Sequence, residues 1–67
     1  MSEFKRKYTT NIKQLREAAG FTQHQLAKKM RVHQPRIAHW ESGYCKPMAS
    51  SLKKLTKLLG PLEFVPL

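Results

Sequence analysis

Only one cysteine, Cys45, occurs in the 67-residue chain, so no disulfide framework can be drawn for it. We therefore expect a reduced thiol in a cytoplasmic protein. No run of apolar residues approaches the roughly 18 to 20 that a membrane-spanning helix needs, and the first residues lack the apolar core of a signal peptide. The sequence thus predicts a soluble protein with no membrane partner.

Acidic residues are scarce, and the imbalance of charge is large. Four acidic residues stand against 13 lysines and arginines, which gives a formal net charge of +9 at pH 7. A surface of this charge attracts polyanions. Duplex DNA, RNA and anionic lipid would each satisfy it, so the charge narrows the partner to a class without choosing a member.

Short helices are predicted for most of the chain. Apolar residues recur at helical spacing in four segments, which we place at residues 11–19, 22–30, 34–41 and 49–59. Gly20 ends the first segment, Thr22 and Gln25 form a capping box at the second, and Pro35 lies in the first turn of the third. Because a chain of this length buries only about 60% of its unfolded surface, we expect an economical helical core or a partner subunit.

We divide the chain into three parts. Residues 1–9 carry consecutive basic residues without an apolar period and are predicted to be a basic N-terminal arm, followed by the helical domain of residues 10–60. In the tail, residues 61–67, Leu62 and Phe64 lie two apart between prolines, which is typical of a short extended strand. No second domain that could bind a small molecule is visible, so we expect no small-molecule substrate.

The second and third helical segments are separated by only three residues, Arg31 to His33. Two short helices joined in this way stand at a wide angle, and in a helix-turn-helix the second of them enters the DNA major groove. Its polar residues, among them Arg36, share the outward face, whereas Ile37 and Trp40 face inward. Amphipathicity alone does not distinguish this arrangement from an ordinary surface helix.

Residues 12–60 are similar to the lambda repressor and Cro family of helix-turn-helix domains. The resemblance covers most of the chain and lies in the order and spacing of its motifs. It implies an all-α fold, a compact domain of four to five helices with room for a short C-terminal β-strand, and a sequence-specific transcriptional regulator that binds double-stranded DNA. The matching positions are the run from Ile12 to Gln23, Leu26, Ala27, Val32, Ile37, the run from Trp40 to Gly43, Pro47, and the leucines through Leu59 with Gly60.

The resemblance also assigns roles to individual residues. Arg16 and Glu41 match a buried ion pair of phage members, so we assign them to the architecture. By geometry, a glutamine contacts adenine and an arginine contacts guanine with two hydrogen bonds, each worth about 1 to 3 kcal/mol against a wrong base. The residues implied to read bases are His33, Gln34, Pro35, Arg36 and His39, and those implied to touch phosphate are Thr22, Gln23 and Lys46.

Two positions depart from the family pattern. Arg31 stands where relatives usually carry glycine in a left-handed turn, a conformation that costs other residues about 1 kcal/mol or more, so we expect a slightly reshaped turn. Met48 replaces a serine that often caps the last helix, which leaves Ser50 or Ser51 to cap it instead. Both departures blur helix boundaries without threatening the fold.

Several partners and biological roles stay open. One such domain reads few base pairs, so we expect a homodimer on a palindromic operator, formed when the strand of Leu62 and Phe64 pairs with its copy. In the alternative, these two side chains fold back on their own subunit. Two biological roles are compatible with this architecture. The protein is either a repressor, or an antitoxin that resembles HigA and HipB proteins and also binds a toxin protein. A basic RNA-binding protein is the less favoured alternative.

No catalytic or metal chemistry is indicated. His33 and His39 lack the spacing of a helical ligand pair, and Cys45 stands alone in a loop. The single carboxylate that could orient them, Glu41, is already assigned to the ion pair. We therefore expect a protein that is not an enzyme, that holds no cofactor or metal, and that acts in the bacterial cytoplasm, encoded by a bacterium or a phage.

Overall fold

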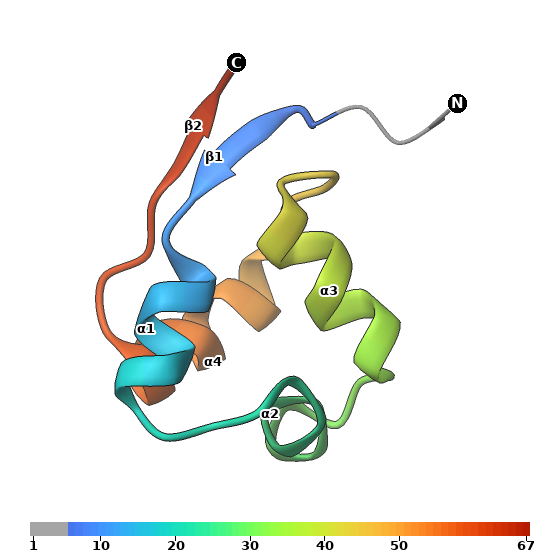
Figure 1. The fold of residues 1–67 in the computed structure, drawn as a ribbon, viewed down its shortest axis with the longest axis vertical. Helices are drawn as coiled ribbons and strands as arrows, with labels where there is room; N and C mark the ends of the chain where they lie inside the picture. Colours follow the sequence, from blue (N-terminus) through green and yellow to red (C-terminus); the bar gives the residue numbers. More distant parts are fainter. Residues whose placement is uncertain (1–5) are drawn as a thin grey trace.

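The computed structural model describes residues 6–67, which form four helices and a two-stranded sheet (Figure 1). This arrangement confirms the expected helical domain with a short C-terminal strand. The first five residues of the predicted basic arm lie outside the described residues. In chain order the elements are β1 (Tyr8–Thr10), α1 (Ile12–Ala18), α2 (Gln23–Met30), α3 (Gln34–Ser42), α4 (Ala49–Leu59) and β2 (Phe64–Pro66).

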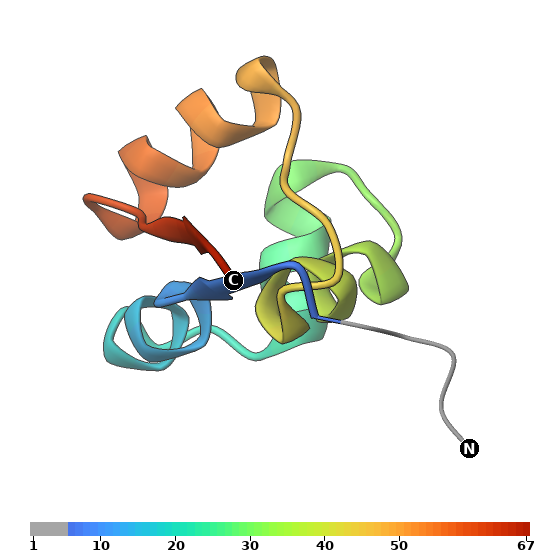
Figure 2. The same cartoon turned by 90° about the horizontal axis from the view of Figure 1, so that it is seen from above.

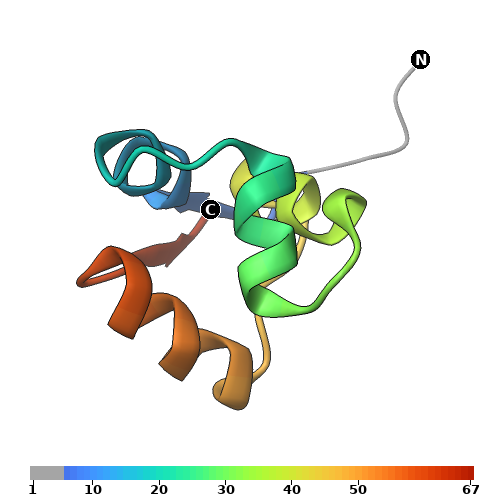
Figure 3. The same ribbon diagram turned by 90° about the horizontal axis from the view of Figure 1, so that it is seen from below.

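The hydrophobic core lies where the four helices meet. Each helix contributes one fully buried aliphatic side chain: Ile12 from α1, Leu26 from α2, Ile37 from α3 and Leu55 from α4. These residues form the apolar stripes of amphipathic helices, whose opposite faces are polar. Seen from below, α2 lies between α3 and α4 (Figure 3), so the two helices that flank it present their outer faces on different sides of the molecule.

The two strands bring the ends of the described chain together (Figures 1 and 2). They pair antiparallel, with Tyr8 opposite Pro66, Thr9 opposite Val65 and Thr10 opposite Phe64. Residues 8 and 9, which were expected in the basic arm, are part of β1 instead. Their partner strand lies more than 50 residues further along the chain, so no local apolar pattern signals the pairing.

The side chain of Asn11 connects the C-terminal tail to the start of α1 through two hydrogen bonds. Its side-chain Nδ2 donates to the carbonyl oxygen of Pro61 at 3.3 Å, and its Oδ1 accepts from the N–H of Glu63 at 2.9 Å. The neighbouring Thr10 accepts a hydrogen bond from the N–H of Ile12 through its hydroxyl oxygen. The tail therefore enters β2 from a fixed position beside α1.

At both departures from the family pattern the backbone differs from what the sequence predicts. Arg31 has φ 59° and ψ 43°, the left-handed conformation that glycine adopts most easily, so the expectation of a reshaped turn is wrong. The arginine takes this conformation at a cost of about 1 kcal/mol or more. Met48 stands at the N-cap of α4 without a side-chain hydrogen bond, and α4 begins directly at Ala49, so neither Ser50 nor Ser51 takes the capping position.

Candidate nucleic-acid interface

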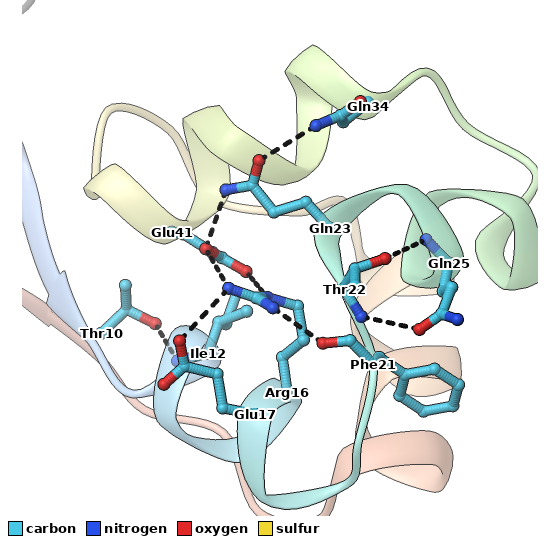
Figure 4. A network of polar contacts seen from close by, with 10 residues as sticks. All are labelled: Thr10, Ile12, Arg16, Glu17, Phe21, Thr22, Gln23, Gln25, Gln34 and Glu41. Carbon is cyan, nitrogen blue, oxygen red and sulfur yellow. Dashed lines mark hydrogen bonds and ion pairs between the residues drawn. The ribbon is translucent and has the colours of Figure 1, made fainter.

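The start of α2 is fixed by a complete capping box. The hydroxyl of Thr22 accepts from the N–H of Gln25 at 3.0 Å, and the Gln25 side chain accepts from the N–H of Thr22 at 2.9 Å (Figure 4). This reciprocal pair satisfies two of the backbone donors that a helix start leaves without partners. As at any helix start, the other N–H groups of the first turn have no partner within the helix, an arrangement that can bind an anion.

Helix α3 starts from an extended residue and a proline in its first turn. His33 occupies the N-cap with φ −76° and ψ 146°, and Pro35 follows at the first turn as the sequence predicts. His33, Gln34, Pro35 and Arg36 are exposed. Because Ile37 and Trp40 of the same helix are buried, the polar residues at its N-terminal end form the outer surface of α3.

A hollow of about 370 Å³ lies between α3 and the loop that follows it. The loop lies over the later turns of α3 and places Lys46 on the same surface as the exposed residues of α3. This surface joins one residue predicted to touch phosphate with four of the five predicted to read bases. The hollow is lined by His33, Pro35, Arg36, His39, Trp40, Cys45 and Lys46.

Gln34 lies outside this hollow and joins a chain of polar contacts on α2 (Figure 4). Its Nε2 donates to Oε1 of Gln23 at 3.3 Å, and the Nε2 of Gln23 donates to Oε1 of Glu41 at 3.0 Å. Gln23, which was expected to touch phosphate, therefore also links the ion pair to Gln34. No local signal predicts this bridge, because only the angle between α2 and α3 brings the first residues of the two helices together.

The ion pair of Arg16 and Glu41 is present and nearly excluded from solvent. Arg16 is 8% exposed, and the Glu41 side chain is 6% exposed. Nε of Arg16 donates to Oε2 of Glu41, Nη2 donates to Oε1 at 3.3 Å, and Nη1 donates to the carbonyl oxygen of Phe21 at 2.7 Å. The pair therefore ties α1 to the end of α3 and to the segment that leads into α2.

Exposed charge around α2 and α3 has one sign. Between residues 18 and 62 the sequence contains a single acidic residue, Glu41, and its charge is neutralised by the buried arginine. The exposed charged side chains of the two helices and their turn are Lys28, Lys29, Arg31 and Arg36. Within residues 18–62, therefore, no unpaired carboxylate would repel a phosphate backbone.

Tyr44 is a further residue beside α3, and it was not predicted from the sequence. Its ring lies 5.3 Å from that of His39, centroid to centroid, and its N–H donates to the carbonyl oxygen of His39 at 3.1 Å. Both side chains are half-buried. The contact holds the imidazole of His39 against the loop, and no local pattern in the sequence distinguishes Tyr44 from an ordinary loop residue.

The residues predicted to form the dimer contact pack against their own subunit. Leu62 and Phe64 are half-buried against the core. The rings of Phe64 and Tyr8 meet edge to face, with their centroids 6.1 Å apart. This matches the alternative in which they fold back, because β1 supplies the strand partner that the tail needs. The exposed apolar residues at this end are Val65 and Leu67, with 53% and 73% of their surface accessible.

Within residues 6–67, no group of three or more histidines, cysteines or carboxylates is placed to hold a metal ion. No helix of the described part of the chain is long and apolar enough to cross a membrane.

Comparison with known proteins agrees with this geometry. The family model described as helix-turn-helix matches residues 12–66, which includes every helix and reaches into β2. No curated protein and no solved structure matches the chain. The match spans well over half of the chain and includes both helices of the motif with their capping residues. The chain therefore belongs to the Cro/C1-type helix-turn-helix family and is a DNA-binding protein of the transcription-regulator type.

Proposed function

We propose that this protein is a repressor that binds a palindromic operator as a homodimer, with α3 in the major groove. The observation that supports this most directly is the exposed polar surface of α3, which lies beside Lys46 and carries no unpaired carboxylate. In a helix-turn-helix the second helix reads base edges while the first lies across the backbone. Residues 10–60 form the DNA-binding unit in this proposal.

Affinity in this proposal comes from phosphate neutralisation. Lys46 and the amides at the start of α2, next to Thr22 and Gln23, contact the backbone on either side of α3. Release of condensed counterions then makes binding fall steeply with salt. These contacts position the protein without choosing a sequence, so the choice falls to the reading helix.

Sequence preference comes from Gln34, Pro35 and Arg36. The hydrogen bond from Gln34 to Gln23 uses one of the two N–H groups of its amide and leaves the other N–H and the oxygen for the paired contact to adenine. Arg36 is exposed and positioned to make the paired contact to guanine. The ring of Pro35 is suited to the methyl group of thymine, and His33 and His39 flank these readers.

Replacing Arg36 with alanine is expected to relax the preference at one base pair of the operator. The loss on the best site is about 1 to 3 kcal/mol, which is about fivefold to 150-fold in affinity, whereas a site altered at that base pair loses little. Lys46→Ala is the matched control, because it removes one positive charge from the same surface. It is expected to weaken all duplexes alike and to lower the salt slope by about 1. Anisotropy titrations on a set of single base-pair variants measure both effects, and a uniform loss for Arg36→Ala would contradict its role as a reader.

The dimer in this proposal forms through the exposed residues at the C-terminal end. Leu67 donates its N–H to Lys7 across the sheet, so the neighbouring Pro66 faces outward and offers no N–H at its position on the free edge of β2. The contact therefore relies on the side chains of Val65 and Leu67.

Val65→Lys is expected to shift sedimentation velocity profiles from dimer toward monomer with unchanged circular dichroism. Ala18→Lys, which adds the same charge on exposed α1, should leave the profile unchanged, and a concentration-independent monomer in the unaltered protein would contradict the proposal.

A further inference from the structure

Helix α4 presents a second basic surface. Lys53, Lys54 and Lys57 are exposed, and no acidic residue occurs between Ser42 and Leu62. Each of the three lysines has another three or four positions away on the helix, and like charges at this spacing destabilise a helix by a few tenths of a kcal/mol per pair. The first turn of α4 also lacks an acidic residue that would interact favourably with the helix dipole.

These lysines have no counter-charge within residues 6–67. Both ion pairs in that part of the chain are made by Arg16, with Glu17 and with Glu41. The positive charge of α4 is therefore balanced only by solvent ions, and a bound polyanion would relieve the repulsion along the helix.

An apolar hollow accompanies the charge. It has a volume of about 530 Å³ and is lined by Ala49, Leu52 and Thr56 together with Lys53 and Lys57. A smaller hollow of about 220 Å³ adjoins it and shares the same two lysines. The surface thus combines small and aliphatic groups with the two lysines, which lie four positions apart along one flank of the apolar residues, and the aliphatic stems of the lysines extend its apolar part.

The α4 surface is separate from the reading helix. Figures 2 and 3 show α4 on a different side of the fold from α3, with α2 between them in Figure 3. The residues that line the hollow beside α3 and those that line the hollows on α4 are different. A duplex that contacts the residues of the hollow beside α3 would therefore contact none of the residues that line the hollows on α4.

We propose that the α4 surface, defined by Ala49, Leu52, Lys53, Thr56 and Lys57, binds an acidic amphipathic segment of a partner protein. Glutamates or aspartates of the segment pair with the two lysines, and its apolar side chains enter the hollow beside them, over Ala49 and Leu52. This inference does not depend on the operator or on the dimer.

Charge alone would equally suit a nucleic acid, and the apolar part of the surface decides between them. A phosphate backbone has no apolar groups with which to cover Leu52 and Ala49, whereas an amphipathic peptide covers them and gains from their burial.

The test uses a fluorescein-labelled helical peptide with glutamates and leucines along one face, titrated with the full chain and followed by anisotropy. The peptide is expected to bind the unaltered protein, and Lys53→Gln with Lys57→Gln is expected to weaken binding about tenfold or more. Lys28→Gln with Lys29→Gln is the matched control, because it removes the same charge from exposed positions of α2. This control should change the affinity less than about twofold. Circular dichroism of each variant verifies that the fold is retained.

Three results would overturn the proposal. Equal losses for the two pairs of substitutions would mean that only net charge matters. Equal affinity for a peptide of the same composition with its leucines and glutamates scattered would mean that the hollow takes no part. If the Lys53 and Lys57 pair instead weakened a short DNA duplex more than the control pair did, while leaving the peptide unaffected, α4 would be a phosphate contact.

Discussion

Replacing Glu41 with alanine is expected to lower the free energy of unfolding by about 3 to 5 kcal/mol, because the nearly buried Arg16 guanidinium then keeps only the exposed carboxylate of Glu17, 3.8 Å away, as a counter-charge. A domain of this length has a total stability of about 3 to 10 kcal/mol, so the change removes much of it. The substitution also takes away the acceptor of Gln23, whose side chain connects the ion pair to Gln34. We therefore expect the loss of stability to be accompanied by a less fixed position of Gln34 at the start of α3.

Urea denaturation followed by the fluorescence of Trp40 measures this effect, since that side chain is 2% exposed and changes environment on unfolding. Glu17→Ala is the control: the Glu17 side chain is 58% exposed and lies 3.8 Å from the same arginine, so a loss below about 1 kcal/mol is expected. If Glu41→Ala leaves no folded protein to titrate, joint replacement by Arg16→Met and Glu41→Leu is expected to restore the cooperative transition. Equal losses for Glu41→Ala and Glu17→Ala would refute the structural role of the pair.

Replacing Gly43 with alanine is expected to cost about 3 kcal/mol. Its φ of 81° penalises any side chain by about 1 to 2 kcal/mol, and a Cβ there would lie 2.0 Å from the carbonyl oxygen of Tyr8. Strand β1 must then move away, which breaks the hydrogen bonds that the N–H groups of Lys7 and Tyr8 donate to the carbonyl oxygen of Gly43. Each of these contributes about 0.5 to 1.5 kcal/mol.

Gly20 offers a closely matched control for this substitution. Its φ of 84° is nearly the same, yet a Cβ at Gly20 would meet nothing within 4 Å. Gly20→Ala is therefore expected to cost only the conformational part, about 1 to 2 kcal/mol. The difference between the two variants, measured in urea under the same conditions, isolates the contact between β1 and the end of α3. If the two losses are equal, the strand does not depend on Gly43.

Features decided by neighbouring residues could be predicted from the sequence. The capping box of Thr22 and Gln25 and the helix start before Pro35 depend on residues within one turn of each other, and both are present as expected. The pairing of Arg16 with Glu41 followed from the family resemblance rather than from a local pattern. The helical core also followed, because the apolar spacing of each segment selects the face that it buries.

Features that join distant residues could not be predicted in the same way. Strand β1 exists because Tyr8 meets the tail and Gly43, which are remote in the chain. The contact of Gln23 with Gln34 and Glu41 depends on the angle between α2 and α3. Arg31 shows the reverse case, where a local rule predicted a change of backbone and the surrounding fold kept the left-handed turn in spite of its cost.

Selection of bound sites from a random duplex DNA library at near-physiological salt, followed by anisotropy titration of the selected site, tests the central claim most directly. We expect an inverted repeat with half-sites about one helical turn apart, bound at least about a thousandfold more tightly than scrambled DNA. Binding without a selected motif, and with equal affinity for scrambled DNA, would contradict the claim that α3 reads a palindromic operator.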